Sequence, residues 1–458
     1  EHSPQPKLIV FNNQLAESFG LDYKNKASIV EILSGNRPAK HSNPIAMAYA
    51  GHQFGHYVPE LGDGRALLLG EMANNKGKTY DLHLKGSGKT RYSRNGDGRA
   101  PLAACLREYI MSEAMHALAI PTTRSLAVIA TGQDIHRQQG LMPGGILARI
   151  ASSHLRIGSF EYAAQNTQGS HCKALADFAI KRHFPSLLKS EHPYQELLRS
   201  VCLQQAKLVA KWMQIGFIHG VMNTDNMAIS GETFDYGPCA LLEDFDYNKT
   251  FSSIDLNGRY AYGNQGNIAQ WDLTCLAHAM LQLLDKDHHK AAHIAQNIID
   301  GFNEQFQKFY WQGMHEKIGG DYLKNNQKPL ILDLLSMMQK HHADYTLTFR
   351  LLGDSLDMPH ARKRLFALFH DADDFQQWYQ RWHTNQEKAQ MHLVNPIYVP
   401  RNHLVEQIIQ QTIEDQAPKA TLHFLEALSA PYTPKEGYEK YAQPAQTDEI
   451  VCQTFCGT

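Results

Sequence analysis

The chain contains His219-Gly-Val-Met-Asn-Thr-Asp225-Asn226, and nine residues after Asn226 comes Asp235, within Phe234-Asp235-Tyr236-Gly237. The Asn226 amide and the Asp235 carboxylate offer hard oxygen donors, and Mg²⁺ usually takes only one or two such ligands from a protein. These stretches therefore predict a divalent-metal site formed by Asn226 and Asp235. The alternative is that Asn226 caps a helix and Asp235 lies in an ordinary turn.

The spacing of this region is typical of protein kinases. A kinase holds its nucleotide-bound metal with an Asn seven residues after the His of its catalytic loop and with the Asp of a later Asp-Phe-Gly. The kinase base would stand two residues after His219, at Val221, which cannot accept a proton. Asp225 is free to act as the base instead, or to reach the metal through water. We therefore expect chemistry that differs from ordinary γ-phosphoryl transfer.

Periodicity predicts an α+β protein with the element order of a kinase small lobe, followed by helices. Alternation and apolar runs predict strands at 66–72, 79–85, 125–130 and 145–151. Between the second and third strands, Leu102, Leu106, Ile110, Ala114 and Leu118 predict a helix that begins near Pro101 and stops before Pro121. Later helices are expected to end near Gly216 and to cover about 267–284 and 291–315. Residues 43–64, rich in Gly and His, predict a loop.

A two-lobed, protein-kinase-like fold follows from this order. Its expected parts are an N-terminal segment (1–42), a small lobe (43–160), a large lobe with the catalytic and metal loops (161–320), a helical C-terminal extension (321–430) and a flexible tail (431–458).

Composition excludes several classes of protein. The net charge of −2 gives no basic field for nucleic acid or an anionic membrane, and no segment approaches the ~18 apolar residues of a membrane span. The first residues resemble neither a signal peptide nor a transit peptide, so we expect a cytoplasmic protein, or a mitochondrial one if a presequence has been removed.

The cysteines are few, odd in number and mostly within apolar stretches, which indicates a reducing compartment. Cys452 and Cys456 lie in the tail, where a redox function and an inert end of the chain are competing interpretations. His52 and His56 are four apart, but Gly51 and Gly55 disfavour a helix, so zinc is not expected at this pair.

Cationic side chains are candidates for phosphate binding. Gly62-Asp-Gly64-Arg65 combines glycines that let an anion approach the backbone with a forked cation, although a tight turn would look the same. Lys85 ends a strand and Glu108 lies on a largely apolar helix stripe, so the two are expected to pair rather than to be solvated separately. Arg149 and Arg156 add two cations, with ordinary surface arginines as the alternative.

Longer motifs lie along nearly the whole chain: Gly51-His-Gln-Phe-Gly-His56, Leu61-Gly-Asp-Gly-Arg65, Leu84-Lys-Gly-Ser-Gly-Lys-Thr90, His219–Asn226, Asp235-Tyr-Gly-Pro238 and Asn395-Pro…Pro400-Arg-Asn-His403. They resemble the selenoprotein O family of protein nucleotidyltransferases. The resemblance implies a kinase-like fold that binds ATP in a flipped orientation and transfers AMP to Ser, Thr or Tyr of target proteins. It also implies that UMP from UTP is an alternative, with manganese.

The resemblance assigns a role to each matching residue. Asp225 would be the proton acceptor, Asn226 and Asp235 the ligands of Mg²⁺ or Mn²⁺, and Cys456 a counterpart of a selenocysteine found third from the C-terminus in many eukaryotic members. The nucleotide contacts would be Gly62, Gly64, Arg65, Lys85, Asp97, Gly98, Arg149, Arg156 and Asp235. ATP and protein substrates are the expected partners of a monomer. A non-catalytic nucleotide-binding scaffold and an ordinary kinase are the rival interpretations.

Overall fold

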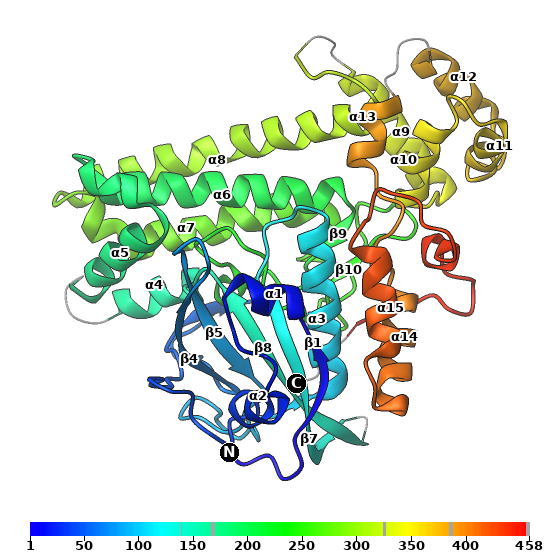
Figure 1. Cartoon of the computed structure of the whole chain (residues 1–458). Helices are drawn as coiled ribbons and strands as arrows, with labels where there is room; N and C mark the ends of the chain where they lie inside the picture. The colour runs from blue at the N-terminus through cyan, green and yellow to red at the C-terminus, as the bar shows by residue number, and fades with distance from the viewer. Residues whose placement is uncertain (139, 166–169, 324–326, 384–387, 455–458) are drawn as a thin grey trace.

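The computed structural model describes residues 1–138, 140–165, 170–323, 327–383 and 388–454 of the chain. These residues form a mixed α+β structure, which confirms the predicted class, with an antiparallel sheet next to a larger assembly of helices (Figure 1). The sheet has the strand order β1-β7-β8-β5-β4, and a short β6 pairs with β8. Its strands are β1 (Lys7–Phe11), β4 (Ala66–Ala73), β5 (Thr79–Lys85), β6 (Ala100–Pro101), β7 (Arg124–Arg137) and β8 (Gly140–Ala151).

The helices fall into groups along the chain (Figure 1). Two short helices follow β1, α3 follows β6, and the remaining helices come after the sheet. The helices are α1 (Asn13–Ser18), α2 (Lys26–Leu33), α3 (Leu102–Ala117), α4 (Ile157–Ala164), α5 (Ser170–His183), α6 (Pro193–Gln214), α7 (Gln265–Leu284), α8 (His288–Lys317), α9 (Lys328–His341), α10 (Tyr345–Asp354), α11 (Pro359–Ala367), α12 (Asp373–Trp382), α13 (Lys388–Val394), α14 (Asn402–Asp415) and α15 (Lys419–Leu428).

The predicted strands at 66–72 and 79–85 are confirmed, and they form a hairpin. β4 and β5 pair antiparallel from Ala66 opposite Lys85 to Ala73 opposite Thr79, with a register shift between Leu68 and Gly70. The predicted strands near 125 and 145 are also present, but as β7 and β8 they are longer than the apolar cores that predicted them. The prediction that 43–64 is all loop is wrong. That segment contains a small β2–β3 ribbon, formed by Gly51–Gln53 and His56–Val58, because backbone pairing does not require an apolar pattern.

Both faces of β5 are buried, although its alternation predicts one polar face. Leu82 and Leu84 pack with Leu15 and Leu33, so the N-terminal segment covers the outer face of the sheet. On the opposite face, His83 and Lys85 line the cavity described below, whereas Asp81 is buried against His154 and Arg182. These side chains are therefore held by ion pairs and hydrogen bonds rather than by water.

The apolar line of α3 is buried as its spacing predicts, with Leu102, Leu106, Ile110, Ala114 and Leu118 all nearly inaccessible. The sheet contacts one side of α3, and α14 and α15 contact another (Figure 1). Arg107 stabilises the contact between α3 and α14, because its guanidinium donates to Asn402 Oδ1 at 3.2 Å and to Glu406 Oε1 at 2.7 Å.

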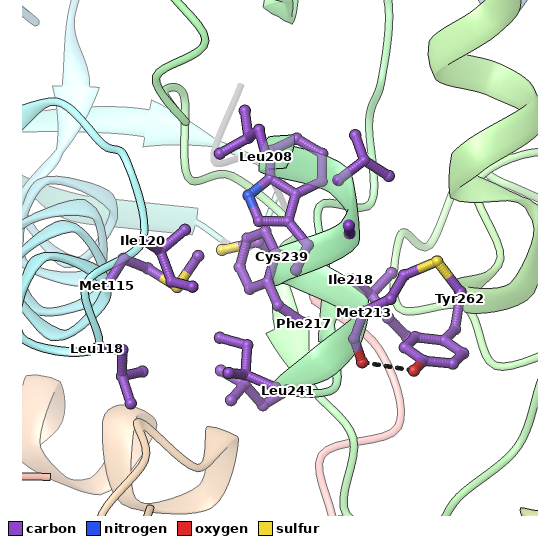
Figure 2. Packing of buried hydrophobic residues seen from close by; sticks show 14 of the residues in the cluster. Met115, Leu118, Ile120, Leu208, Met213, Phe217, Ile218, Cys239, Leu241 and Tyr262 are labelled. Atoms are coloured by element: carbon purple, nitrogen blue, oxygen red, sulfur yellow. Dashed lines mark hydrogen bonds between the residues drawn. The ribbon is translucent and has the colours of Figure 1, made fainter. Parts of the chain in front are cut away.

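β9 (Phe217–Ile218) and β10 (Ala240–Leu241) pair as a two-stranded ribbon, and the segment between them contains Asp225, Asn226 and Asp235. Figure 2 shows that the ribbon is embedded in the core beside residues from the end of α3 and from α6. Tyr262 reinforces this core, since its hydroxyl donates to the Met213 carbonyl at 2.6 Å (Figure 2). Burying one large apolar side chain contributes roughly 1.5–3 kcal/mol. The ribbon is therefore fixed relative to α3, which carries Glu108.

The predicted helices after the sheet are confirmed as α6, α7 and α8, with boundaries displaced by a few residues. α8 packs along both α6 and α7 (Figure 1). None of the described helices combines the length and apolar character needed to cross a bilayer. In the tail, Tyr441 and Thr454 are buried, and Thr454 bonds to the Phe251 and Pro238 carbonyls at 2.8 and 2.7 Å. The division into five parts, with its four boundaries, and the flexibility of 431–458 stay predictions.

Candidate active site

The residues predicted to bind nucleotide and metal, together with Asp225 and Glu108, line one cavity of about 1120 Å³. Small-molecule sites typically measure roughly 300–1000 Å³, so this cavity is large enough for a nucleotide and part of a second reactant. It lies between the sheet, the start of α3 and the loops joining β9 to β10. The lining includes Gly62, Gly64, Arg65, Lys85, Asp97, Gly98, Glu108, Arg149, Arg156, Asp225, Asn226 and Asp235.

Asp235 is surrounded by cations from different parts of the sheet and the loop after it. Lys85 Nζ and Arg149 Nη2 both lie 2.6 Å from its Oδ1, and Arg156 Nη1 lies 4.0 Å from its Oδ2. Burial raises the pKa of Asp235, but the charges of Lys85, Arg149 and Arg156 outweigh it and hold that pKa well below the usual range. Asp235 is therefore an ionised oxygen donor at neutral pH, as a metal ligand must be.

The backbone at Asp235 is unusual, with a φ of 59°. A non-glycine residue in this left-handed region is strained and is more often found where a functional side chain must be aimed. His219 helps to hold the strained turn, because its Nε2 lies 3.0 Å from the carbonyl oxygen of Phe234. The His of one motif thus positions the Asp of the other.

Glu108 connects the two cations nearest to Asp235. Its Oε2 lies 2.8 Å from Lys85 Nζ and its Oε1 lies 2.5 Å from Arg149 Nη2, and only 4% of its side chain is exposed. A buried carboxylate between the partly buried Lys85 and the buried Arg149 fixes the direction of the amino and guanidinium groups. Arg149 is therefore a second partner of Glu108, which spacing along the chain did not predict.

Replacing Glu108 with Gln is expected to destabilise the protein by about 3 kcal/mol, because it leaves Lys85 and Arg149 with a single buried counter-charge. Urea denaturation of both proteins would measure this loss. The matched control is Glu406→Gln, which removes a half-exposed carboxylate from Arg107 and should cost less than about 1 kcal/mol. Equal losses in the two variants would contradict the proposed function of Glu108 as a buried anchor.

Asp225 is buried and also lines the cavity. Its Oδ1 accepts no hydrogen bond from any residue that the structure describes. Burial raises the pKa of Asp225 to about 6, while Arg156 opposes the increase. Gly51 makes room for this side chain, because a Cβ at that position would lie 2.7 Å from Asp225 Oδ1. A carboxylate with a free oxygen and a pKa close to neutrality has the properties of a general base.

Asn226 presents its amide to the same cavity. Its Nδ2 donates to the carbonyl oxygen of Val221 at 3.1 Å, which leaves Oδ1 as the side-chain atom suited to a cation. Val221 itself is buried and offers no titratable group. The donor set of Asn226 and Asp235 therefore fits a hard divalent cation, since it consists of one amide oxygen and one ionised carboxylate.

Two glycines of the predicted phosphate loops are required by their backbone conformation and by close packing. Gly62 has a φ of 69°, and a Cβ there would lie 2.2 Å from the Tyr92 ring. Gly98 has a φ of 67°, and a Cβ there would collide with the backbone of Gly88 at 2.2 Å. Asp97, next to Gly98, is paired with Arg137 at 2.8 Å. Both loops are thus shaped to bring backbone close to the cavity wall.

The sequence was compared with known proteins. The model of the family described as protein adenylyltransferase SelO matches residues 1–429. The chain belongs to this family. It is 46% identical over 468 residues to the protein nucleotidyltransferase YdiU of Maridesulfovibrio salexigens, covering 99% of this chain and 93% of that protein. It is 47% identical to the protein of the same name from Bradyrhizobium diazoefficiens, covering 99% of this chain and 94% of that one.

In this SelO-family chain, Asp63 is a site residue that the motifs did not single out. It accepts from the Met47 backbone N–H at 3.1 Å, contacts His83 Nε2 at 3.1 Å and lies 3.9 Å from Arg156. Burial alone would raise the pKa of Asp63, but His83 and Arg156 have the larger combined effect. The net result is a pKa below the usual value. Asp63 thus orients Arg156 toward the cavity. In the sequence, the feature that points to Asp63 is its position between Gly62 and Gly64 of the predicted phosphate loop.

Of the two tail cysteines predicted as a possible redox pair in this SelO-family chain, the structure describes one. Cys452 is exposed, and Cys456 lies outside the described residues. We predict that mild oxidation changes activity through Cys456, because thiols close to a chain end, such as the exposed Cys452, are open to oxidants. The measurement compares wild type with Cys456→Ser under reducing and oxidising conditions. Identical activity of both proteins in both conditions would remove this prediction.

Proposed function

We propose that this SelO-family chain is a protein adenylyltransferase that transfers AMP from ATP to hydroxyl groups of target proteins and releases pyrophosphate. The observation that carries this proposal is the buried carboxylate of Asp225, with its unbonded Oδ1, in the same cavity as Asn226, Asp235 and a cluster of cations. A scaffold that only binds nucleotide has no need of such a carboxylate.

A two-lobed, kinase-like arrangement is part of this proposal. It is supported by the antiparallel sheet with α3 packed on it, by the helical assembly that follows, and by the cavity between them. Val221 argues against an ordinary kinase, because it occupies the position of the kinase base and is apolar.

In the proposed reaction the substrate hydroxyl oxygen attacks the α-phosphorus, and the bond from that phosphorus to the pyrophosphate oxygen breaks. Asp225 accepts the hydroxyl proton. Lys85, Arg149 and Arg156 stabilise the charge that develops on the leaving pyrophosphate, exchanging part of their contact with Asp235 for phosphate oxygens. Gly62, Gly64, Arg65, Asp97 and Gly98 are proposed to complete the nucleotide site.

Asn226 and Asp235 are proposed to hold Mg²⁺ or Mn²⁺. When bound, such an ion neutralises phosphate charge and orients the phosphate chain. UTP is a second candidate nucleotide. Ser, Thr and Tyr are the proposed acceptors, and we propose a cytoplasmic monomer that acts on proteins and not on nucleic acid.

The decisive experiment uses ATP labelled at either the α- or the γ-phosphorus, incubated with the protein, Mg²⁺ or Mn²⁺ and a protein extract. We expect label to enter protein only from the α position, together with release of pyrophosphate and a mass gain of one AMP unit. Label from the γ position alone would identify a kinase. Absence of both, with ATP still bound, would identify a scaffold.

A further inference from the structure

A cluster of potential metal ligands lies next to the catalytic loop and is not used by the proposed reaction. It consists of His52 on β2, Glu161 on α4 and Cys275 on α7, and their ligand atoms all lie within 4.8 Å of one another. His52 Nδ1 is 2.5 Å from Glu161 Oε1. Glu161 is buried, whereas His52 and Cys275 are partly exposed, so an ion can enter from solvent.

The partner of His52 is therefore not His56, which is exposed on the next strand. Zinc is not expected at His52 and His56 from the sequence, because Gly51 and Gly55 disfavour a helix there. The fold instead brings His52 to side chains that are more than a hundred positions away in the chain. Sequence spacing contains no signal for such a site.

The chemistry of the three donors selects a class of metal. An imidazole nitrogen, a carboxylate oxygen and a thiolate sulfur are ligands of Zn²⁺, and ligands on one tetrahedral zinc lie roughly 3.5 Å apart. A thiolate and an imidazole favour borderline ions such as Zn²⁺ or Co²⁺ over the hard ion Mg²⁺. Three protein donors leave the fourth position of a tetrahedron for water.

An independent observation indicates that the negative charge of this region is only partly compensated by the nearby Arg259. Asp272 lies on α7 one turn before Cys275, is fully buried, and neither of its carboxylate oxygens accepts a hydrogen bond from a described residue. Burial, and Glu161 to a smaller extent, raise its pKa well above the usual value, although Arg259 opposes them. A divalent cation bound at Glu161 would reduce the electrostatic repulsion between these carboxylates.

The cluster is linked to the residue that precedes Asp225. Glu161 Oε2 accepts from the Thr224 hydroxyl at 2.5 Å, and the same hydroxyl oxygen accepts from the His52 backbone N–H at 2.7 Å. An ion that binds His52 and Glu161 would therefore contact both partners of Thr224. This places the cluster where occupancy can influence the catalytic loop.

We propose that His52, Glu161 and Cys275 form a second metal site, specific for one Zn²⁺-class ion and separate from the Asn226 and Asp235 site. Binding forms bonds from the metal to nitrogen, oxygen and sulfur and releases the thiol proton to solvent. The proposal rests on these three side chains and does not depend on AMP transfer.

Cobalt is the probe, because a Co²⁺–thiolate bond gives a charge-transfer absorption that an oxygen-only site does not. The parent protein carries Cys452→Ser and Cys456→Ser, so that the tail thiols do not contribute. We expect one equivalent of Co²⁺ to produce the charge-transfer band, Zn²⁺ to remove it, and excess Mg²⁺ to leave it. Absence of the band, or its removal by Mg²⁺ alone, would overturn the proposal.

Variants locate the ion. Cys275→Ser should abolish the band. His52→Gln should weaken Co²⁺ binding by at least about tenfold, because even the loss of a residue that only hydrogen-bonds to a metal ligand usually lowers metal affinity by that much. Cys202→Ser, which removes a buried thiol of α6, should change nothing. Asp235→Asn should also retain the band. Retention of the band in Cys275→Ser, or its loss in Asp235→Asn, would contradict a separate site, and circular dichroism would verify that each variant is folded.

Discussion

Asp235→Asn is expected to lower AMP transfer by at least about a thousandfold and to remove the metal dependence of nucleotide binding. A bound metal ion contributes several kcal/mol of charge stabilisation in the transition state, and each 1.36 kcal/mol corresponds to a factor of ten in rate, so losing a ligand that holds the ion is costly. Asn keeps the shape of the side chain but removes the charge that Lys85, Arg149 and Arg156 surround. The measurements are the transfer rate and the ATP affinity at increasing Mg²⁺ or Mn²⁺.

Asp333→Asn is the matched control for this substitution. Asp333 is on α9, pairs with Arg381 at 2.9 Å and is about half exposed, so its loss should leave the rate unchanged. If the Asp235→Asn protein kept a metal-dependent ATP affinity equal to that of the wild type, Asp235 would not be a metal ligand. Lost activity with an unchanged affinity would place its effect on another step.

Asp225→Asn is expected to lower the transfer rate by about 10²–10⁴-fold, the usual contribution of a general base. ATP and metal should still bind, because the predicted ligands and cations are unchanged. The substitution is nearly isosteric, which matters since Gly51 and Gly158 leave little space around Asp225. A loss of ATP affinity as large as the loss of rate would contradict the assignment of Asp225 as a base.

The pH dependence gives an independent test of the same residue. A base acts in its ionised form, and burial raises the pKa of Asp225 to about 6. The rate should therefore fall as the pH decreases through about 6 and reach a plateau above it. A cation bound nearby would move the midpoint to a lower pH. The residual rate of Asp225→Asn serves as the control, since it should lack this step; a wild-type rate that is flat between pH 5 and 8 would contradict the prediction.

Much of the candidate site could be proposed from the sequence because its residues occur as local patterns. Asn226 and Asp235 are separated by a fixed spacing, and Lys85 and Glu108 lie on a strand and a helix whose periodicity is clear. Asp63 was missed because a single acidic residue between glycines looks like a turn. Arg149 was predicted as a phosphate ligand, but its ion pair with Glu108 was not predicted. That pair depends on β8 lying beside β5, and the periodicity of a strand does not determine which strand lies next to it.

The sequence by itself determined the α+β class, the main strands and helices, and the kinds of side chain available for chemistry, because these depend on periodicity and residue type over short distances. Only the tertiary structure decided that the N-terminal segment covers the sheet, that Asp225 lies against Gly51 with an unbonded oxygen, and that His52 meets Glu161 and Cys275. Such contacts join positions far apart in the chain. Their energies come from burial and charge pairing in the folded state, for which no local pattern codes.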